Sequence, residues 1–441
     1  MELQRVYKLY VRYMVLGNRR GISTPWYTRH KWFVGEKKHG GSGLNLKRSS
    51  VDSCLYYREE IVGGTIHKTW NPEHDEWVLH TVGGKSHRIW ILLYVDDVAV
   101  AYCKTNPITK RLRDEFRASL LKEFKVDDRG DLEHFLGYKF MRDRVNRKLK
   151  MTQTAPLMKL LKESGMLTTE TKMTPASPEC KPSLKDKPNL DTEEGKAEAA
   201  TMADKPFANR VGSLLWIART YRPDISWIVG MLTRFMACPG LKTWQYSSCA
   251  LKYLSSTKNR GLIYSHSNNG MTLRGVCDAN HLSDYGNAKE NRKNTIGWAF
   301  FLGNASISVR SRKAQRPSCS TAESETQALW DAIREAVWLR RMMKDFGIEQ
   351  TNSTIIECDS QVAIRLTEED CESERSKHWD GEFHCIRNEV NERESVKIQF
   401  VESGKCTADT LTKPVSRRIF DEHATRLLGR EWMFDGEEIL A

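Results

Sequence analysis

Two adjacent aspartates, Asp96 and Asp97, separate two apolar runs within residues 88–101, and most residues of these runs are strong β-formers. The pattern predicts a strand, a carboxylate-bearing turn and a second strand. Two ionised carboxylates side by side repel each other, and a bound divalent cation would relieve that repulsion. Asp96 and Asp97 are therefore candidate metal ligands. The alternative is an ordinary hairpin with a solvated turn, because aspartate is a common turn former.

A second acidic set lies in the last third of the chain. Asp278 falls within a predicted strand and shares a face with Val276, and Asp359 closes the apolar run 355–358. Asp409 lies in a segment that predicts the first turn of a terminal helix. With one further acid on a helix, these carboxylates could converge on one edge of a sheet.

That helical acid must be chosen between two neighbours. The predicted helix over residues 322–346 carries an apolar stripe, and at about 100° per residue Glu325 falls within this stripe. A carboxylate is costly to bury on the core-facing side of a helix, so its presence there indicates a function. Glu323 falls on the opposite side, three residues after Ser320, and this spacing predicts a capping box at the helix start. We therefore assign Glu323 to structure and Glu325 to the site.

The four carboxylates of Asp278, Glu325, Asp359 and Asp409 suit hard cations, which prefer oxygen ligands. Two Mg²⁺ or Mn²⁺ ions about 4 Å apart can activate a water and stabilise the departing oxygen of a phosphodiester. The set therefore predicts a nuclease that uses Mg²⁺ or Mn²⁺. The alternative is four unrelated surface acids among the 57 of the chain.

Lys377, Asp380, His384 and Arg387 are spaced by three, four and three residues and would share one face of a helix. Asp380 and His384 could ligate a metal. Lys377 and Arg387 would repel that cation, which favours a salt-bridged or phosphate-contacting surface. Lys377, His384 and Arg387 are therefore candidate substrate contacts.

The charge of the chain favours a polyanionic partner. The formal net charge is +12, and the first fifty residues carry eleven lysines and arginines against two acidic residues. Nucleic acid is the leading candidate. The alternative for the basic terminus is a solvated or disordered arm.

The eleven cysteines contain no C-x-x-C pair, which argues against a zinc ribbon and fits reduced thiols. No apolar stretch reaches the ~18 residues of a membrane span, and no signal peptide is evident. We expect a soluble intracellular protein of the cytoplasm or nucleus, with no membrane partner.

With 441 residues, the chain has room for several domains. Residues 51–173 predict a small, mainly antiparallel sheet followed by a compact αβ region. Residues 174–207 hold five of the thirteen prolines and no apolar period, which is typical of a linker. Three helices are predicted over residues 209–218, 223–237 and 243–255. From about residue 271, strands are predicted over residues 272–278, 295–302, 305–310, 354–358 and 396–401, and helices between the later strands indicate a mixed sheet. The fold class is therefore α+β or α/β.

Several motifs of the chain resemble those of the Pol polyprotein of copia-type LTR retrotransposons. The resemblance covers nearly the whole chain, and its motifs follow the order of that family. They include Tyr94-Val-Asp-Asp97, Gly130-Asp-Leu-Glu-His-Phe-Leu-Gly137, Val211-Gly-Ser-Leu-Leu-Trp-Ile-Ala218, Cys277-Asp-Ala279, Ser320-Thr-Ala-Glu-Ser-Glu325, Glu357-Cys-Asp-Ser-Gln-Val-Ala-Ile364 and Ala408-Asp-Thr-Leu-Thr-Lys-Pro414.

The resemblance implies a reverse-transcriptase palm over residues 1–103 and a palm-end and thumb-like region over 104–173. After the linker it implies a helical connection over 208–270 and an RNase H domain over 271–441. Asp96 and Asp97 would match the metal pair of the polymerase, and Asp278, Glu325, Asp359 and Asp409 the four acids of RNase H. The implied substrate is an RNA–DNA hybrid.

Departures from the family pattern limit this expectation. An earlier polymerase aspartate belongs to a motif that would precede this chain, and Ser53 stands where the family usually has proline. We therefore expect an incomplete polymerase region and an intact RNase H domain. One alternative is a catalytically silent relic or a co-opted nucleic-acid-binding protein. Another is that the missing motif is encoded directly upstream.

Overall fold

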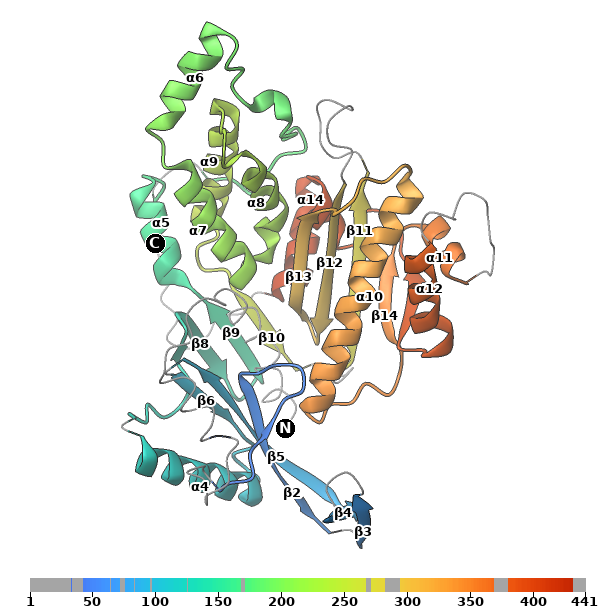
Figure 1. Cartoon of the computed structure of the whole chain (residues 1–441). Helices are drawn as coiled ribbons and strands as arrows, with labels where there is room; N and C mark the ends of the chain where they lie inside the picture. Colours follow the sequence, from blue (N-terminus) through green and yellow to red (C-terminus); the bar gives the residue numbers. More distant parts are fainter. Residues whose placement is uncertain are drawn as a thin grey trace. The chain divides into compact units, whose positions relative to one another are not determined.

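The computed structural model describes residues 33, 43–63, 65–71, 76–82, 84–95, 97–124, 126–167, 171–266, 271–281, 294–368 and 380–430. The chain divides into two compact units (Figure 1). The first comprises residues 1–135 with 344–347, and the second comprises residues 136–343 with 348–441. The five-part division predicted above is finer than this and stays a prediction.

The first unit is built on a four-stranded antiparallel sheet. Its strands run in the order β1 (Lys47–Arg48), β2 (Leu55–Val62), β5 (Lys85–Tyr94) and β6 (Asp97–Ala101). A separate hairpin joins β3 (Thr65–Asn71) to β4 (Glu76–Val82). Ile89, Ile91 and Leu93 alternate along β5 and are fully buried, since every second side chain of a strand faces the same way.

Helix α4 (Pro107–Glu123) completes the core of the first unit. Asn106 caps it, because the Asn106 side chain accepts hydrogen bonds from the backbone amides of Ile108 and Thr109. Leu112 and Phe116 then pack into the same core as Ile89, Ile91 and Leu93.

The second unit begins with the antiparallel strands β8 (Tyr138–Asp143), β9 (Lys148–Thr152) and β10 (Leu262–Ser265), where β9 is central. Helices α5 (Thr154–Glu163), α7 (Phe207–Thr220), α8 (Ser226–Leu232) and α9 (Leu241–Ser256) accompany them. The single helix predicted over residues 223–237 is wrong in detail. Short 3-10 turns at Pro223–Ile225 and Thr233–Phe235 flank α8.

The predicted linker also contains structure that the proline count concealed. A 3-10 turn spans Leu184–Asp186, and helix α6 spans Glu193–Ala203. Thr192 caps α6 by accepting a hydrogen bond from the Gly195 amide at 3.1 Å. Two glutamates in the first turn also suit the positive end of the helix.

The rest of the second unit is the predicted five-stranded mixed sheet, which the structure confirms. Its order is β13 (Ala305–Lys313), β12 (Thr295–Leu302), β11 (Leu273–Asn280), β14 (Thr354–Cys358) and β15 (Val396–Phe400). The β13–β12–β11 pairs are antiparallel, and β11–β14–β15 are parallel. The overall fold class is α+β.

Helices cover both faces of this sheet (Figure 1). One face packs on α10 (Thr321–Asp345), where Ala279 and Ile296 meet Ala328. The other packs on α13 (Asp409–Thr412) and α14 (Arg417–Leu428), where Val276 meets Leu411 and Leu427. Alternation along β11 therefore sends Cys277 and Ala279 toward α10 and Val276 and Asp278 toward α13.

Helices α11 (Gln361–Glu368) and α12 (Asp380–Arg387) and a π-helical turn at Asn388–Glu392 lie between β14 and β15 in the sequence. Within the described part of the chain, no helix combines the length and apolar character that crossing a membrane requires.

Candidate metal centre

Asp278 is the acid at the centre of the sheet. It lies on β11, is 1% exposed and is on the face covered by α13. The Thr412 hydroxyl donates a hydrogen bond to Asp278 Oδ2, and the Lys413 ammonium lies 3.9 Å from the same oxygen. The end of α13 therefore orients this carboxylate.

Asp409 is the first residue of α13 and is 2% exposed. Its Oδ2 accepts a hydrogen bond from the Gly404 amide at 3.1 Å, and Lys413 Nζ lies 2.8 Å from its Oδ1. Asp359 directly follows β14 and is partly buried. Carboxylate oxygens of Asp278, Asp359 and Asp409 lie within 4.8 Å of one another. We call these three residues the α13 half of the centre.

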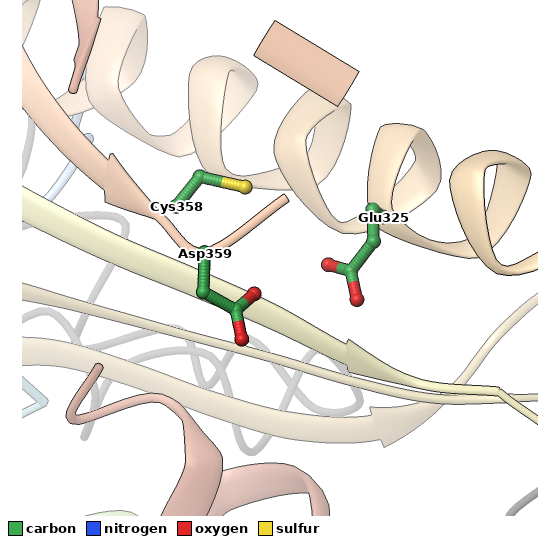
Figure 2. A group of neighbouring side chains, drawn as sticks. All are labelled: Glu325, Cys358 and Asp359. Carbon is green, nitrogen blue, oxygen red and sulfur yellow. The ribbon is translucent and has the colours of Figure 1, made fainter. Parts of the chain in front are cut away.

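Glu325 approaches from the other face. It projects from α10 and is 5% exposed, and its Oε2 accepts a hydrogen bond from the Ala279 amide at 3.1 Å. A Glu325 oxygen, Cys358 Sγ and an Asp359 oxygen also lie within 4.8 Å of one another (Figure 2). We call Glu325, Cys358 and Asp359 the α10 half.

The structure thus brings together the four acids predicted from the sequence, in two groups that share Asp359. Among the residues that the structure describes, no group within this distance contains all four carboxylates. Cys358, which sequence reasoning did not single out, joins the α10 half. Its place at the end of an apolar strand, directly before Asp359, was the signal available.

Burial and mutual repulsion shape the electrostatics of the centre. Burial, opposed by Lys413 and reinforced by Asp409 and Asp359, raises the pKa of Asp278 to about 7. Burial, together with Asp278, also raises the pKa of Glu325 well above its ordinary value. The pKa of Asp359 rises through burial and the charge of Asp409. A divalent cation would relieve this cost by favouring the ionised carboxylates.

The donor set fits a hard cation. Asp278, Glu325, Asp359 and Asp409 offer oxygen ligands, which Mg²⁺ and Mn²⁺ prefer. A hydrogen bond with Cys358, together with burial, raises the pKa of the neighbouring Cys277 thiol, which keeps that thiol protonated. The four carboxylates supply the oxygen ligands of the centre, and such a set suits a hard divalent cation.

The structure describes only some of the other predicted site residues. Asp97 begins β6, is exposed and pairs with Tyr94 across the predicted hairpin, whereas Asp96 lies outside the described residues. Lys377 also lies outside them. His384 is exposed on α12 and Arg387 ends that helix. Within the described ranges, no metal-ligand group includes His384, so these residues stay predicted substrate contacts.

Sequence comparison relates this chain to known proteins. No protein-family model matches it. The retrovirus-related Pol polyprotein from transposon TNT 1-94 of Nicotiana tabacum is 32% identical over 393 residues, which cover 88% of this chain and 28% of that protein. The Pol polyprotein from transposon RE1 of Arabidopsis thaliana is 30% identical over 341 residues, with 77% and 21% covered. The chain thus spans less than a third of the length of these relatives.

Solved structures resemble the chain at lower identity. LC11-RNase H1, isolated from compost, is 12% identical with a TM-score of 0.25, covering 34% of this chain and 96% of its own. The foamy viral protease-reverse transcriptase in complex with dsDNA is 13% identical with a TM-score of 0.36, covering 71% and 55%.

Proposed function

Because the chain belongs to the Pol polyprotein family of copia-type retrotransposons, we propose that its five-stranded domain cleaves the RNA strand of RNA–DNA hybrids. Asp278, Glu325, Asp359 and Asp409 would hold the divalent cations for this reaction. The cations would activate a water and stabilise the departing oxygen of the phosphodiester.

The observation that carries the proposal is the convergence of acids from four separate elements. Strand β11, helix α10, the end of β14 and helix α13 each contribute one carboxylate to a single region. Three of the four carboxylates have a raised pKa, as expected where acids are crowded without solvent, and the fourth, Asp409, is paired with the ammonium of Lys413. A core that served packing alone would hold apolar residues at these positions.

Hydrogen bonds from the chain itself pre-orient the ligands. Thr412 donates to Asp278, the Ala279 amide donates to Glu325, and the Gly404 amide donates to Asp409. Each bond leaves further lone pairs of its carboxylate for a cation. Because these hydrogen bonds already fix the carboxylates in place, the carboxylates lose less entropy when the cation binds.

The basic character of the chain suits a nucleic-acid substrate. The net charge of +12 supports phosphate contacts, and His384 and Arg387 on α12, with Lys377, are the contacts we propose. We also propose that the β5–β6 hairpin, with Asp97 and the adjoining Asp96, is the counterpart of the polymerase metal pair in the family.

The same charge supports a second candidate function, a nucleic-acid-binding protein without catalysis. The two candidates differ in one measurement. A binding protein would retain hybrid in a salt-dependent manner and leave the RNA strand intact with Mg²⁺.

The test uses the full chain and a hybrid labelled on its RNA strand. We expect Mg²⁺-dependent nicking that Asp278→Asn abolishes. The matched control is Glu357→Gln, which removes an acid from β14 that pairs with Arg274 and Arg426 outside the centre. That variant should keep cleaving. Binding without cleavage would favour the second candidate, and cleavage by Asp278→Asn would refute the site.

A further inference from the structure

Lys413 places a cationic group inside the acidic centre. Its Nζ lies 2.8 Å from Asp409 Oδ1 and 3.9 Å from Asp278 Oδ2, and its side chain is 33% exposed. Lys413 directly follows α13, four residues after Asp409, so the helix that supplies one ligand also positions the ammonium. One ammonium therefore offsets part of the negative charge of two carboxylates of the α13 half.

The α10 half has a different environment. The groups that act most strongly on the Glu325 carboxyl are Asp278, Cys358 and Asp359, together with the hydrogen bond from the Ala279 amide. These groups are anionic or neutral. The Lys413 ammonium does act on Asp359, the residue that the two halves share. Positive charge is thus concentrated on one side of the centre.

We propose that Lys413 makes the two cation positions of the centre unequal. A divalent cation bound between Asp278 and Asp409 must displace the Lys413 ammonium, whereas one bound between Glu325 and Asp359 need not. This inference rests on the proposed metal centre, and it adds an order of binding: the α10 half fills first and the α13 half second. Lys413 thereby sets the cation concentration at which the second ion binds.

The change in charge at Lys413 should alter the cation affinity of the centre by a measurable amount. Removing the ammonium leaves the buried carboxylates of Asp278 and Asp409 without their cationic partner, so an incoming cation meets more negative charge. Like charges about 4 Å apart interact strongly even at the effective dielectric constant of a protein surface. We expect cation binding to the weaker position to tighten roughly tenfold or more once Lys413 is neutral.

The experiment counts bound ions directly. The full chain, freed of metal with EDTA and dialysed, is titrated with Mn²⁺ while electron paramagnetic resonance measures the free ion. The unaltered protein should bind two Mn²⁺ ions with unequal affinity. Lys413→Met should bind the second ion tighter, and Lys413→Arg should keep the inequality because the charge remains. Lys405→Met is the matched control, because Lys405 pairs only with the exposed Glu402 among the ion pairs of the described residues.

Thermal unfolding supplies a second readout. In EDTA, Lys413→Met should melt at a lower temperature than the unaltered protein, and added Mg²⁺ should raise its melting temperature by a larger amount. If the variant does not fold in EDTA, circular dichroism during a Mg²⁺ titration measures the same coupling through the folded fraction. A loss of stability with unchanged Mn²⁺ binding would overturn the proposal, since Lys413 would then be only structural.

These outcomes are separable from those of the proposed function, because neither measurement needs hybrid cleavage. Tighter Mn²⁺ binding by Lys413→Met in a chain that cleaves nothing would refute the nuclease and support the role of Lys413. Cleavage by the unaltered chain with identical Mn²⁺ binding in both proteins would refute the role of Lys413 alone.

Discussion

Gly297 lies directly opposite Asp278 in the antiparallel pair of β11 and β12. Helix α13 packs against Gly297 so closely that a Cβ atom there would lie 2.7 Å from Leu411 Cβ and 3.0 Å from Thr412 Cγ2. The glycine therefore allows α13 to bring Thr412 and Asp409 to the carboxylate of Asp278.

Gly297→Ala should push α13 away from the sheet and weaken the centre. We expect a loss of about 1–3 kcal/mol in unfolding free energy from overpacking, together with weaker Mn²⁺ binding and slower cleavage. Urea unfolding and Mn²⁺ titration measure both effects. Gly212→Ala is the control, because nothing lies within 4 Å of a Cβ at Gly212 in α7. That variant should be neutral or more stable, and equal behaviour of the two variants would contradict the packing argument.

The raised pKa of Asp278 predicts how stability depends on pH without metal. Folding raises this pKa from 3.8 to about 7, so the folded chain holds the proton more tightly than the unfolded chain. The stability contributed by this proton is complete below pH 3.8 and is lost as the pH rises through about 7. In EDTA, urea unfolding should therefore show a larger loss of stability between pH 5 and pH 8 for the unaltered chain than for Asp278→Asn. Equal losses would show that Asp278 ionises in the folded state as it does in the unfolded state.

The buried ion pair of Arg222 and Asp224 predicts a large effect on stability. Both side chains are fully buried, and the Tyr253 hydroxyl also donates to Asp224 Oδ2 at 2.6 Å. Asp224→Ala would leave the guanidinium buried without its partner and should cost about 3–5 kcal/mol of unfolding free energy. Breaking the exposed pair of Arg418 and Glu422 by Arg418→Ala should cost at most about 1 kcal/mol. Similar costs in urea unfolding would contradict the difference in burial.

Two neighbouring glutamates of α10 should separate stability from catalysis. Glu323 Oε2 accepts a hydrogen bond from the Cys319 amide at 2.5 Å, and the Glu323 amide donates to Ser320 Oγ at 3.2 Å. Glu323→Ala should therefore cost about 1 kcal/mol of stability and leave cleavage intact. Glu325→Gln should abolish cleavage without a comparable loss of stability. Loss of cleavage in a folded Glu323→Ala would contradict this division.

Periodicity in the sequence was enough to predict most of the elements that carry the centre. The predicted strands over residues 295–302 and 354–358 match β12 and β14 at both ends, because both segments are rich in β-branched or aromatic residues. The helical period predicted Glu325 on the core side of α10 and Glu323 on the opposite side, but both residues are 5% exposed. Their partners distinguish them, because the Cys319 amide donates to Glu323 and the Ala279 amide donates to Glu325. Composition was weaker evidence, and the prolines of residues 174–207 concealed α6.

Only the tertiary structure decided how the acids meet. A period shows which side of its own element a residue faces, but the distance between Asp278 and Asp409 depends on strand order and on the packing of α13 against Gly297. The same packing places Asp359 in both halves of the centre and brings the ammonium of Lys413 to two of its carboxylates. These contacts join elements that are distant in the chain, so no local pattern in the sequence encodes them.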